Sequence, residues 1–361
     1  MQKPDNQLEI LKQLYSTLSD ECKQEFLKAI VEKATNSSPK NDSGKMSLDE
    51  FLQRRKYENG RPTVCPLCGG THIVKNGSTR GIARYLCRKC GKTFGDTEDT
   101  ILKSTKKSLD VWRLYIQCMI EKHSLRKCAE ICHISLPVAF MWRHKILDAL
   151  QNMMEQVRLD GVVEADETFM AISYKGCHKQ ESMPRKPHKR GTKATKRGLS
   201  CEKVCIPCGV NMSGLSIAKI SNLGKPSWKD IDKVLGGKVE KGSVLVTDSF
   251  RGYNRLAYDM EVDHIRIRPK KHTNGTFNIQ LLNNYHLQLK RMVNDKFRGV
   301  STKYLNNYLV YHNLVNFSKG TESFKEETMF NFTLSTKCSR RYVDIPTRAA
   351  IPVLDAMMSS Q

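Results

Sequence analysis

Four cysteines in two Cys-x-x-Cys pairs are the residues whose spacing most directly predicts chemistry. Cys65 and Cys68 form the first pair, Cys87 and Cys90 form the second, and eighteen residues separate the two pairs. Two thiolates at this spacing can bind one zinc ion from a tight turn, and two such turns complete a tetrahedral site. Because the protein supplies all four ligands, we expect the zinc to be structural.

The residues around these cysteines predict a zinc ribbon within a region that spans 47–100. Gly69 and Gly91 each follow the second cysteine of a pair, where a turn often needs positive φ. The residues between the pairs predict short strands joined by turns. We expect the ribbon to contact DNA, although a solvated basic face is the alternative, and the candidate residues are Arg84, Arg88 and Lys89.

Two aspartates, Asp166 and Asp248, lie in segments that predict strands. The segment GVVEADETFMAIS has Asp166 at its middle, and the apolar run of SVLVTDSFRGY ends in Asp248. If the two strands are neighbours in one sheet, the carboxylates converge, and shared divalent cations offset their repulsion. Two magnesium ions held in this way can promote phosphoryl transfer.

The elements that must position these aspartates predict an α/β fold over residues 156–320. Three strands are followed by helix, strand, helix, strand and helix, an order that favours a mixed sheet with flanking helices. The last helix carries Asn283 and Lys290. Seven residues make about two helical turns, so these two side chains share one face.

A helix-turn-helix is predicted within residues 101–155. Two helical segments, near 124–132 and 136–149, are separated by a tight turn, and Ser135 can cap the second. We expect the second segment to enter the major groove of DNA. An ordinary helical hairpin is the alternative. The basic residues expected to contact DNA are Arg143 and Lys145.

The charge of the chain indicates a polyanionic partner. The net charge is +23 over 361 residues, and residues 1–60 contribute nothing to it because their charges balance. Nucleic acid is the commonest partner of such a chain. The thirteen cysteines are an odd number, and no apolar run approaches the ~20 residues of a membrane span. We therefore expect a cytoplasmic protein in a reducing compartment that does not bind a membrane.

A basic loop interrupts the first two predicted strands at residues 174–198. It carries nine Lys or Arg residues and one Glu, and we expect contact with DNA phosphate that weakens in salt. A solvated loop is the alternative. The candidate contacts are Arg185, Lys186, Lys189, Arg190, Lys196 and Arg197. A second zinc site is less favoured than buried thiols, and its candidate ligands would be Cys177, His178, Cys201, Cys205 and Cys208.

The chain resembles bacterial insertion-sequence transposases of the DDE, RNase H-like superfamily. It is most similar to the ISXO2-like subgroup, which has an N-terminal zinc ribbon and an Asn in place of the final Glu. The resemblance spans roughly 47–318 and is carried by the ribbon, ADETF, VTDSFRGY, LNNYHLQLKR and FRGVSTKYLNNYLVYHNL. It implies an RNase H-like sheet preceded by a zinc ribbon and a helix-turn-helix.

The resemblance also implies the catalytic residues. Asp166, Asp248 and Asn283 would bind two Mg²⁺ or Mn²⁺ ions, and Lys290 would contact a phosphate. An amide oxygen is a neutral ligand, so the site would hold its metal less tightly than three carboxylates. His286 and Asn284 are alternatives to Asn283, whereas Glu167 would point to the opposite face of its strand.

The implied function is DNA transposition. Water would attack a phosphodiester at the element's end, and the freed 3′-hydroxyl would attack target DNA. We expect the partners to be the terminal inverted repeats, target DNA and a second copy of the chain, in a bacterial cytoplasm and at the nucleoid. The alternatives are a DNA-binding regulator with an inactive catalytic domain, or a nuclease on the same fold. Two flanking regions have no assigned role, a helical segment with its linker at 1–46 and a tail at 321–361.

Overall fold

The computed structural model describes the greater part of the chain after residue 61. The described ranges are 62–79, 82–177, 185–187, 194–269, 271–336, 338 and 341–352. The chain divides into two units, Met1–Glu50 and Phe51–Gln361, and every described residue belongs to the second. The predicted helical segment at 1–46 and the start of the region 47–100 lie outside the described residues.

A small antiparallel sheet lies near the start of the described residues. It consists of β1 (Ile73–Thr79), β2 (Ile82–Cys87) and β3 (Thr93–Gly95) in the order β1-β2-β3. The rings of Tyr85 and Phe94, which are opposite each other on β2 and β3, lie 5.7 Å apart and fill the centre of its core. So small an apolar core gives limited stability by itself, and domains of this size usually need a metal or another crosslink.

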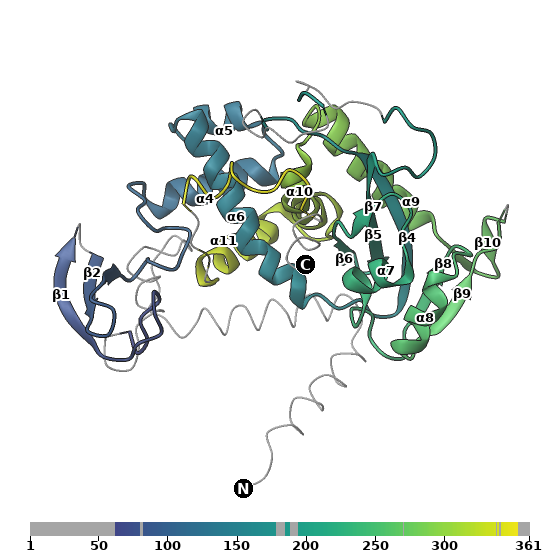
Figure 1. Cartoon of the computed structure of the whole chain (residues 1–361), viewed down its shortest axis with the longest axis horizontal. Helices are drawn as coiled ribbons and strands as arrows, with labels where there is room; N and C mark the ends of the chain where they lie inside the picture. Colours follow the sequence, from purple (N-terminus) through teal and green to yellow (C-terminus); the bar gives the residue numbers. More distant parts are fainter. Residues whose placement is uncertain are drawn as a thin grey trace, which may run out of the picture. The chain divides into compact units, whose positions relative to one another are not determined.

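Helices that precede the main sheet in the sequence pack against helices that follow it, and together they form one helical unit (Figure 1). Its first part is α4 (Leu109–Ile120), α5 (Leu125–Ile131) and α6 (Leu136–Gln156), and its second part is α10 (Leu305–Tyr311) and α11 (Glu322–Ser335). Helix α10 packs against α6, while α11 packs against both α4 and α6. The indole rings of Trp112 and Trp142 stack 3.7 Å apart and join α4 to α6.

The C-terminal segment differs from the predicted tail at 321–361. Helix α11 buries Met329, Phe330 and Leu334, and Ile345 beyond it is also buried. The guanidinium of Arg348 pairs with the buried Asp148 of α6 at 2.5 Å. The sequence prediction missed this because the apolar residues of α11 are interrupted by polar ones, which hides its buried face.

The main sheet is mixed, as predicted from the sequence. Its strand order is β6-β5-β4-β8-β9, with β7 paired to β5. The pairs β4–β5 and β5–β6 are antiparallel, whereas β4–β8 and β8–β9 are parallel. The strands are β4 (Val162–Ala171), β5 (Lys203–Asn211), β6 (Ser216–Ala218), β7 (Asn222–Leu223), β8 (Val244–Thr247) and β9 (Asp263–Arg266).

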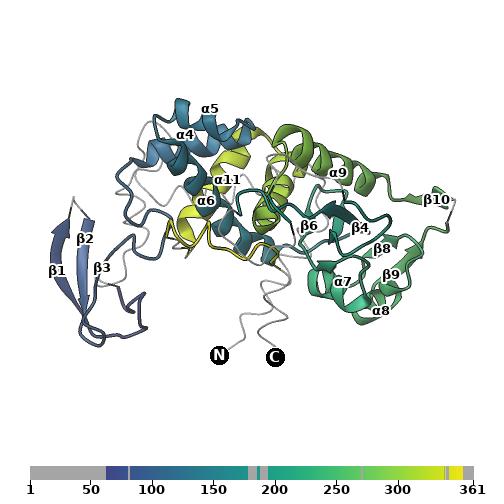
Figure 2. The same ribbon diagram turned by 45° about the horizontal axis from the view of Figure 1, so that its top comes forward.

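Helices cover both faces of this sheet (Figure 2). Helices α7 (Trp228–Leu235) and α8 (Gly252–Asp259) lie on one face, and α9 (Gln280–Arg291) packs on β4 and β5 from the other. A short hairpin of β10 (Thr273–Asn274) and β11 (Phe277–Asn278) precedes α9. The remaining helical turns are 3-10 at Thr302–Tyr304 and π at Met292–Lys296 and His312–Phe317. The predicted α/β class, a mixed sheet with flanking helices, is confirmed.

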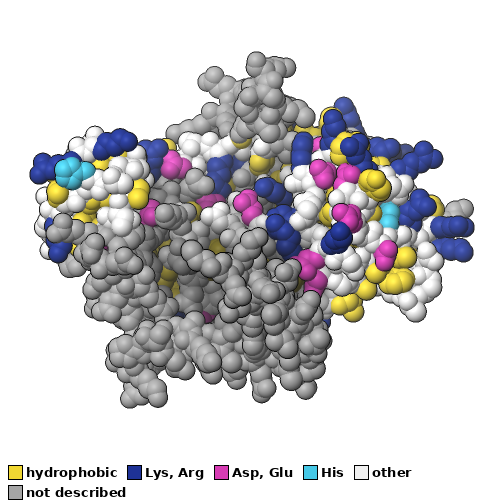
Figure 3. Space-filling view, turned by 90° about the horizontal axis from the view of Figure 1, so that it is seen from below, with side chains coloured by type: hydrophobic (Ala, Val, Ile, Leu, Met, Phe, Trp, Pro, Cys, Tyr) yellow, Lys and Arg dark blue, Asp and Glu magenta, His cyan; other side chains and the backbone are white. Residues whose placement is uncertain are grey.

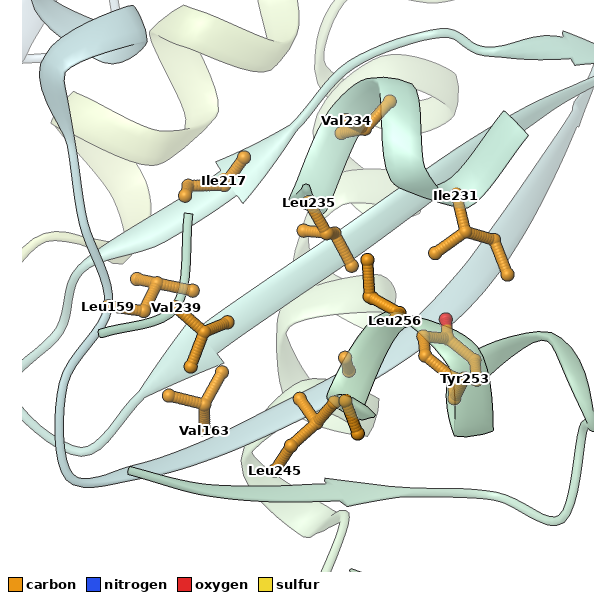
Figure 4. Close-up of a cluster of buried hydrophobic side chains, with 12 residues drawn as sticks. Leu159, Val163, Ile217, Ile231, Val234, Leu235, Val239, Leu245, Tyr253 and Leu256 are labelled. Carbon is orange, nitrogen blue, oxygen red and sulfur yellow. The ribbon is translucent and has the colours of Figure 1, made fainter. Parts of the chain in front are cut away.

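Alternation along β4 decides which side chains face which helices. Val163 and Ala165 join the apolar cluster formed with α7 and α8, which Figure 4 shows in close-up. Glu164 between them points to the other face, where its carboxylate accepts a hydrogen bond from the Leu282 N–H of α9 at 2.8 Å. Because side chains alternate along a strand, Asp166 lies on the α9 face.

None of the helices described in the structure combines the length and the apolar character that crossing a bilayer requires.

Helix α11 provides a direct test of the helical unit. Phe330 is 1% exposed and the Arg113 guanidinium lies 4.2 Å from its ring centroid, whereas Phe324 on the same helix is 49% exposed. We predict that Phe330→Ala lowers the free energy of unfolding by about 3 kcal/mol, because it leaves a cavity in a buried core. Phe324→Ala should change it by less than about 1 kcal/mol. Urea denaturation measures both, and equal effects would show that α11 is not part of the core.

Candidate active site and zinc centre

The four cysteines of the ribbon converge at one point. Their sulfur atoms all lie within 4.8 Å of one another, with Sγ–Sγ distances of 4.0 Å for Cys65–Cys90 and 3.6 Å for Cys68–Cys87. A tetrahedral site with Zn–S bonds of about 2.3 Å places its sulfurs about 3.8 Å apart. These four thiols therefore fit one zinc ion.

Two similar turns bring the thiols together. The Gly69 N–H donates to the Cys65 carbonyl at 2.9 Å, and the Gly91 N–H donates to the Cys87 carbonyl at 2.8 Å. Gly69 and Gly91 adopt φ of +70° and +68°, a region that side chains with a Cβ rarely enter. The positive φ predicted for these two glycines is confirmed.

The aspartates lie next to each other on adjacent parallel strands. In the register of β4 and β8, Ala165 is opposite Thr247, so Asp166 and Asp248 follow one position later on each strand. Residues opposite each other in a parallel pair point to the same face, here the face that α9 covers. The Asp166 Oδ1 accepts the Glu167 N–H and the Asp248 Oδ1 accepts the Phe250 N–H, each at 2.8 Å, which orients both carboxylates.

The electrostatics of Asp166 connect three of the predicted catalytic residues. Burial raises the pKa of Asp166 from 3.8 to about 6, the Glu167 N–H lowers it, the Asp248 carboxylate raises it, and the Lys290 ammonium lowers it. Lys290 is in the last turn of α9. Two acids far apart in sequence and a lysine of a third element are thus close enough to interact. Because the two carboxylates repel without a cation between them, a divalent cation fits this donor set.

The candidate third ligands lie on the same helix. Asn283 is exposed and lies seven residues before Lys290, so both are on one face of α9. His286 lies between them and is buried, and burial and the Lys290 charge lower its pKa to about 4. Its Nε2 atom has no hydrogen-bond partner among the described residues. Asn283 remains the predicted ligand and His286 the alternative, since both are on the appropriate side of α9; Asn284 is also exposed.

Glu167 points to the other face of β4, but its carboxyl still interacts with the charges of Asp166 and Asp248. Burial raises its pKa to about 7, and the alternation of β4 places it on the α8 face, beside the buried Tyr253. Tyr253 is 0% exposed and belongs to the core, as its packing interpretation predicts.

Glu164 is a residue of this site that the sequence prediction missed. Its buried carboxylate accepts the Leu282 N–H, one of the N-terminal donors of α9 that no helical carbonyl can satisfy. Burial raises its pKa, and the N–H groups of Leu282 and Leu281 lower it. The sequence signal that could have identified Glu164 is its position two residues before Asp166, because residues two apart on a strand point to the same face of the sheet. Glu164 therefore fixes the start of α9 to the strand that carries Asp166.

Two predicted DNA contacts are corrected by the structure. Arg143 is 1% exposed and donates to the His123 carbonyl at 3.0 Å and to the Cys128 sulfur at 3.3 Å. Lys145 is 6% exposed and donates to the Ile101 carbonyl at 3.2 Å. Neither charge can reach a phosphate, because this part of α6 is the buried centre of the helical unit.

The helix–turn–helix arrangement itself is present. Helix α5 agrees with the segment predicted near 124–132. Helix α6 begins at the predicted residue 136 but extends to Gln156, seven residues beyond the predicted end, and four residues separate the two helices. The exposed surface is the start of α6 rather than its centre, together with α5. The residues concerned are Arg126, Lys127, His133, Ser135 and Leu136.

The other predicted DNA contacts fall into three groups. Arg185 folds back on the protein, where it donates to the Ile172 carbonyl at 2.6 Å and lies 5.2 Å from the Tyr174 ring centroid. Lys189 and Arg190 lie outside the described residues. The remaining candidates are exposed and stay predictions, namely Arg84, Arg88, Lys89, Lys186, Lys196 and Arg197. Cys205 and Cys208 are buried in β5, and the ribbon holds the only group of three or more converging Cys, His, Asp or Glu ligands among the described residues.

Comparison with known proteins finds a family model that is similar to part of the chain. Residues 158–311 match the family model of the ISXO2-like transposase domain. The chain is 24% identical over 262 residues to an uncharacterized protein in transposable element ISH50 of Halobacterium salinarum, which covers 72% of this chain and 86% of that protein. It is 32% identical over 111 residues to a 48.3 kDa protein of insertion element ISM1 of Methanobrevibacter smithii, over 27% of this chain and 26% of that protein.

A crystal structure of the Mos1 mariner paired end complex with Mn aligns over 60% of this chain and 74% of that chain, at 11% identity and a TM-score of 0.26. Residues 158–311 run from just before β4 to the end of α10, and this segment is similar to the ISXO2-like transposase domain. This match and the two insertion-element relatives support the insertion-sequence transposase family predicted from the sequence.

Metal substitution tests the cysteine cluster. We predict that the protein binds one equivalent of Co²⁺ with the absorption of a tetrahedral thiolate site, and that Zn²⁺ displaces it. Cys87→Ser should abolish this spectrum because it removes one of four converging ligands. Cys201→Ser is the control, since Cys201 is exposed and lies outside the cluster. An unchanged spectrum in Cys87→Ser would contradict the assignment.

The raised pKa of Asp166 predicts a stability change. Folding raises this pKa from 3.8 to about 6. The folded protein is therefore most stable below pH 4, where Asp166 is protonated in both the folded and the unfolded state. It loses this part of its stability as the pH rises to 6, because ionising the buried carboxyl is unfavourable. We predict that Asp166→Asn stabilises the metal-free protein at pH 7 by about 1–3 kcal/mol and has little effect at pH 4. Thermal denaturation at both pH values measures this. Mn²⁺ should stabilise the wild type more than the variant, and a variant less stable at pH 7 would contradict the assignment.

Proposed function

We propose that this transposase binds the ends of its insertion element, cleaves a DNA strand there and joins the freed end to target DNA. The observation that supports this is the convergence of Asp166 of β4 and Asp248 at the end of the adjacent parallel strand β8, with the charge of Lys290 in α9 acting on Asp166. Two carboxylates on the same face of a sheet can hold the metal ions that promote phosphoryl transfer without a covalent protein intermediate.

Asp166 and Asp248 would hold Mg²⁺ or Mn²⁺, with the amide oxygen of Asn283 as a further ligand. When bound, the metal supplies Lewis-acid chemistry at a phosphodiester and lowers the pKa of water. The chain's own residues supply the rest. The Glu167 and Phe250 N–H groups orient the two carboxylates. Lys290 supplies a positive charge for a phosphate oxygen, and Glu164 holds the helix that carries it.

The DNA interface is proposed on exposed basic residues at separate places. The ribbon offers Arg84, Arg88 and Lys89, and the exposed start of α6 with α5 offers a surface that a major groove can accept. The loop after β4 offers Lys186, Lys196 and Arg197. Two DNA ends must be joined together, so we propose that at least two copies of the chain act in one complex.

A DNA-binding regulator with an inactive sheet domain is the competing function. Such a protein would use the ribbon and the helical unit but would gain nothing from Asp166 and Asp248. Burying Asp166 next to Asp248 destabilises the folded protein, because the pKa of Asp166 is raised and the two carboxylates repel each other. A protein that only binds DNA has no reason to retain such a pair. The acid pair therefore favours the enzyme.

Strand cleavage and joining on DNA that carries the element's own ends tests the proposal. We predict that Asp248→Ala lowers cleavage in Mg²⁺ by roughly 100-fold or more, because one of the two metal-binding carboxylates is gone. DNA binding measured in Ca²⁺ should be retained. Asp263→Ala is the matched control, since Asp263 is an exposed acid at the opposite end of the neighbouring strand β9.

The outcome separates the two functions. Cleavage by the wild type and by Asp263→Ala, with loss in Asp248→Ala, supports the enzyme. DNA binding without cleavage by any variant would support the regulator, and equal cleavage by wild type and Asp248→Ala would exclude this active site.

A further inference from the structure

Arg143 of α6 is a buried cation that the proposed function does not use. Its side chain is 1% exposed, and its guanidinium donates to the His123 carbonyl at 3.0 Å and to the Cys128 sulfur at 3.3 Å. Among the described residues, its Nε atom has no hydrogen-bond partner and no carboxylate pairs with it. A buried charge without a counter-ion destabilises a folded protein. The presence of Arg143 at this place therefore needs an explanation other than stability.

The groups around Arg143 stay neutral. Burial raises the pKa of the Cys128 thiol, although the Arg143 charge lowers it, so the sulfur keeps its proton at neutral pH. Burial also raises the pKa of the Tyr115 and Tyr311 hydroxyls. None of these three groups neutralises the Arg143 charge, which interacts with dipoles and ring faces instead.

Arg143 joins two parts of the chain that are far apart in sequence. His123 lies in the turn between α4 and α5, at the start of the helix–turn–helix. The ring centroid of Phe297 lies 5.8 Å from the Arg143 guanidinium carbon, within the range of a cation–π interaction. This ring also lies 5.0 Å from the Tyr308 ring and 5.7 Å from the Tyr311 ring of α10. One side chain of α6 thus contacts both the helix–turn–helix and the chain that follows α9.

Residues 297–302, the joining segment, also contact the residues that follow β4. The Lys175 ammonium donates to the Gly299 carbonyl at 2.8 Å. The Ser173 N–H donates to the Thr302 hydroxyl at 2.8 Å, and the Thr302 N–H donates to the Ser173 carbonyl at 2.9 Å. Because β4 ends two residues before Ser173, the joining segment is attached to the strand that carries the first proposed metal-binding carboxylate.

The backbone of the joining segment forms a tight turn. Arg298 and Gly299 have φ of +50° and +87°, and a residue with a Cβ such as Arg298 keeps this conformation only where its surroundings enforce it. The Phe297 N–H donates to the Met292 carbonyl at 3.0 Å, and the Gly299 N–H donates to the Val293 carbonyl at 2.8 Å. Both acceptors lie in the π turn that continues α9. The joining segment is therefore fixed to the helix that carries the lysine proposed to contact a phosphate.

The proposed function needs a fixed geometry between the DNA-binding surfaces and the acids. DNA that is bound by the helix–turn–helix must present one phosphodiester to Asp166 and Asp248. In Figure 3, Lys and Arg side chains lie toward both ends of the face in view, so the charges that can attract DNA are spread over the molecule. Such distributed charge attracts DNA but does not by itself select one phosphodiester. A rigid connection between the helix–turn–helix and the sheet can select it.

We propose that Arg143 is a positioning residue, which fixes the helix–turn–helix relative to the sheet by binding both the His123 turn and the joining segment. The inference rests on the proposed function and deepens it, because it names the contact that sets which phosphodiester reaches the two carboxylates. An apolar side chain of similar size could fill the same volume, but it could not bind the His123 carbonyl. A small displacement of a bound substrate is enough to slow a reaction greatly.

Removal of the charge with little change in volume tests this role. We predict that Arg143→Met leaves the midpoint of urea denaturation unchanged or raises it, because an unpaired buried charge is gone. The affinity for a duplex of the element's end, measured in Ca²⁺, should stay within about threefold, because the exposed contact surface is unchanged. At saturating protein in Mg²⁺, the rate of strand cleavage should fall by about tenfold to 100-fold, and cuts should appear at neighbouring phosphodiesters.

Arg113→Met is the matched control. The Arg113 guanidinium also lies over a ring of the helical unit, 4.2 Å from the Phe330 ring centroid, but it pairs with Glu326 of α11 at 3.3 Å. This variant should keep the wild-type rate and position of cleavage. Arg143→Lys keeps the charge and should recover part of the rate. Phe297→Leu removes the ring without removing a charge and should shift the cuts as Arg143→Met does, so it tests the same contact if Arg143→Met does not fold.

Two results would overturn the inference while the proposed function stands, and both require a wild type whose cleavage depends on Asp248. If Arg143→Met and Phe297→Leu cleave at the wild-type rate and position, the contact does not position the DNA. If stability, affinity and rate fall in parallel in both variants, with cuts still at the wild-type phosphodiester, Arg143 has a structural role only. A wild type that binds the element's ends without cleaving them contradicts the proposed function itself, and this inference with it.

Discussion

The parallel pairing of β4 with β8 is the constraint on which the rest of this protein depends. Asp166 and Asp248 are separated by a long loop, an antiparallel hairpin and a helix, yet the register Ala165 to Thr247 brings them to the same height on one face. A slip of one residue would turn one carboxylate into the apolar cluster under α7 and α8. The apolar partners of that cluster, Val163, Ala165 and Leu245, hold the register, so the core determines the chemistry of the opposite face.

The same strand also places the helix that completes the site. Glu164 crosses the interface to the first turn of α9, where a buried carboxylate satisfies N–H groups that would otherwise be unpaired. Three consecutive residues of β4 thus have three tasks, since Glu164 holds α9, Ala165 packs in the core and Asp166 faces the proposed metals. Replacing any one of them would disturb the other two.

Much of this arrangement could be predicted from the sequence, and the reasons are local. Short apolar segments indicated the strands that carry Asp166 and Asp248, and the regular Cys-x-x-Cys spacing with Gly69 and Gly91 indicated the ribbon. The sequence could not show that Arg143 and Lys145 are buried, because α6 is covered by α10 and α11, which come more than 150 residues later. Nor could it reveal the role of Glu164, since that role depends on where α9 meets the sheet.

The contact of α11 with α4 and α6 has a consequence for synthesis on the ribosome. The helical unit contains the helix–turn–helix from the early part of the chain, but its core closes only when α11 has been made. Contacts so distant in sequence form slowly, and chains that lack them expose apolar surface. A shortened gene product that ends before residue 322 would lack α11, so the surfaces of α4 and α6 that pack against it would stay uncovered.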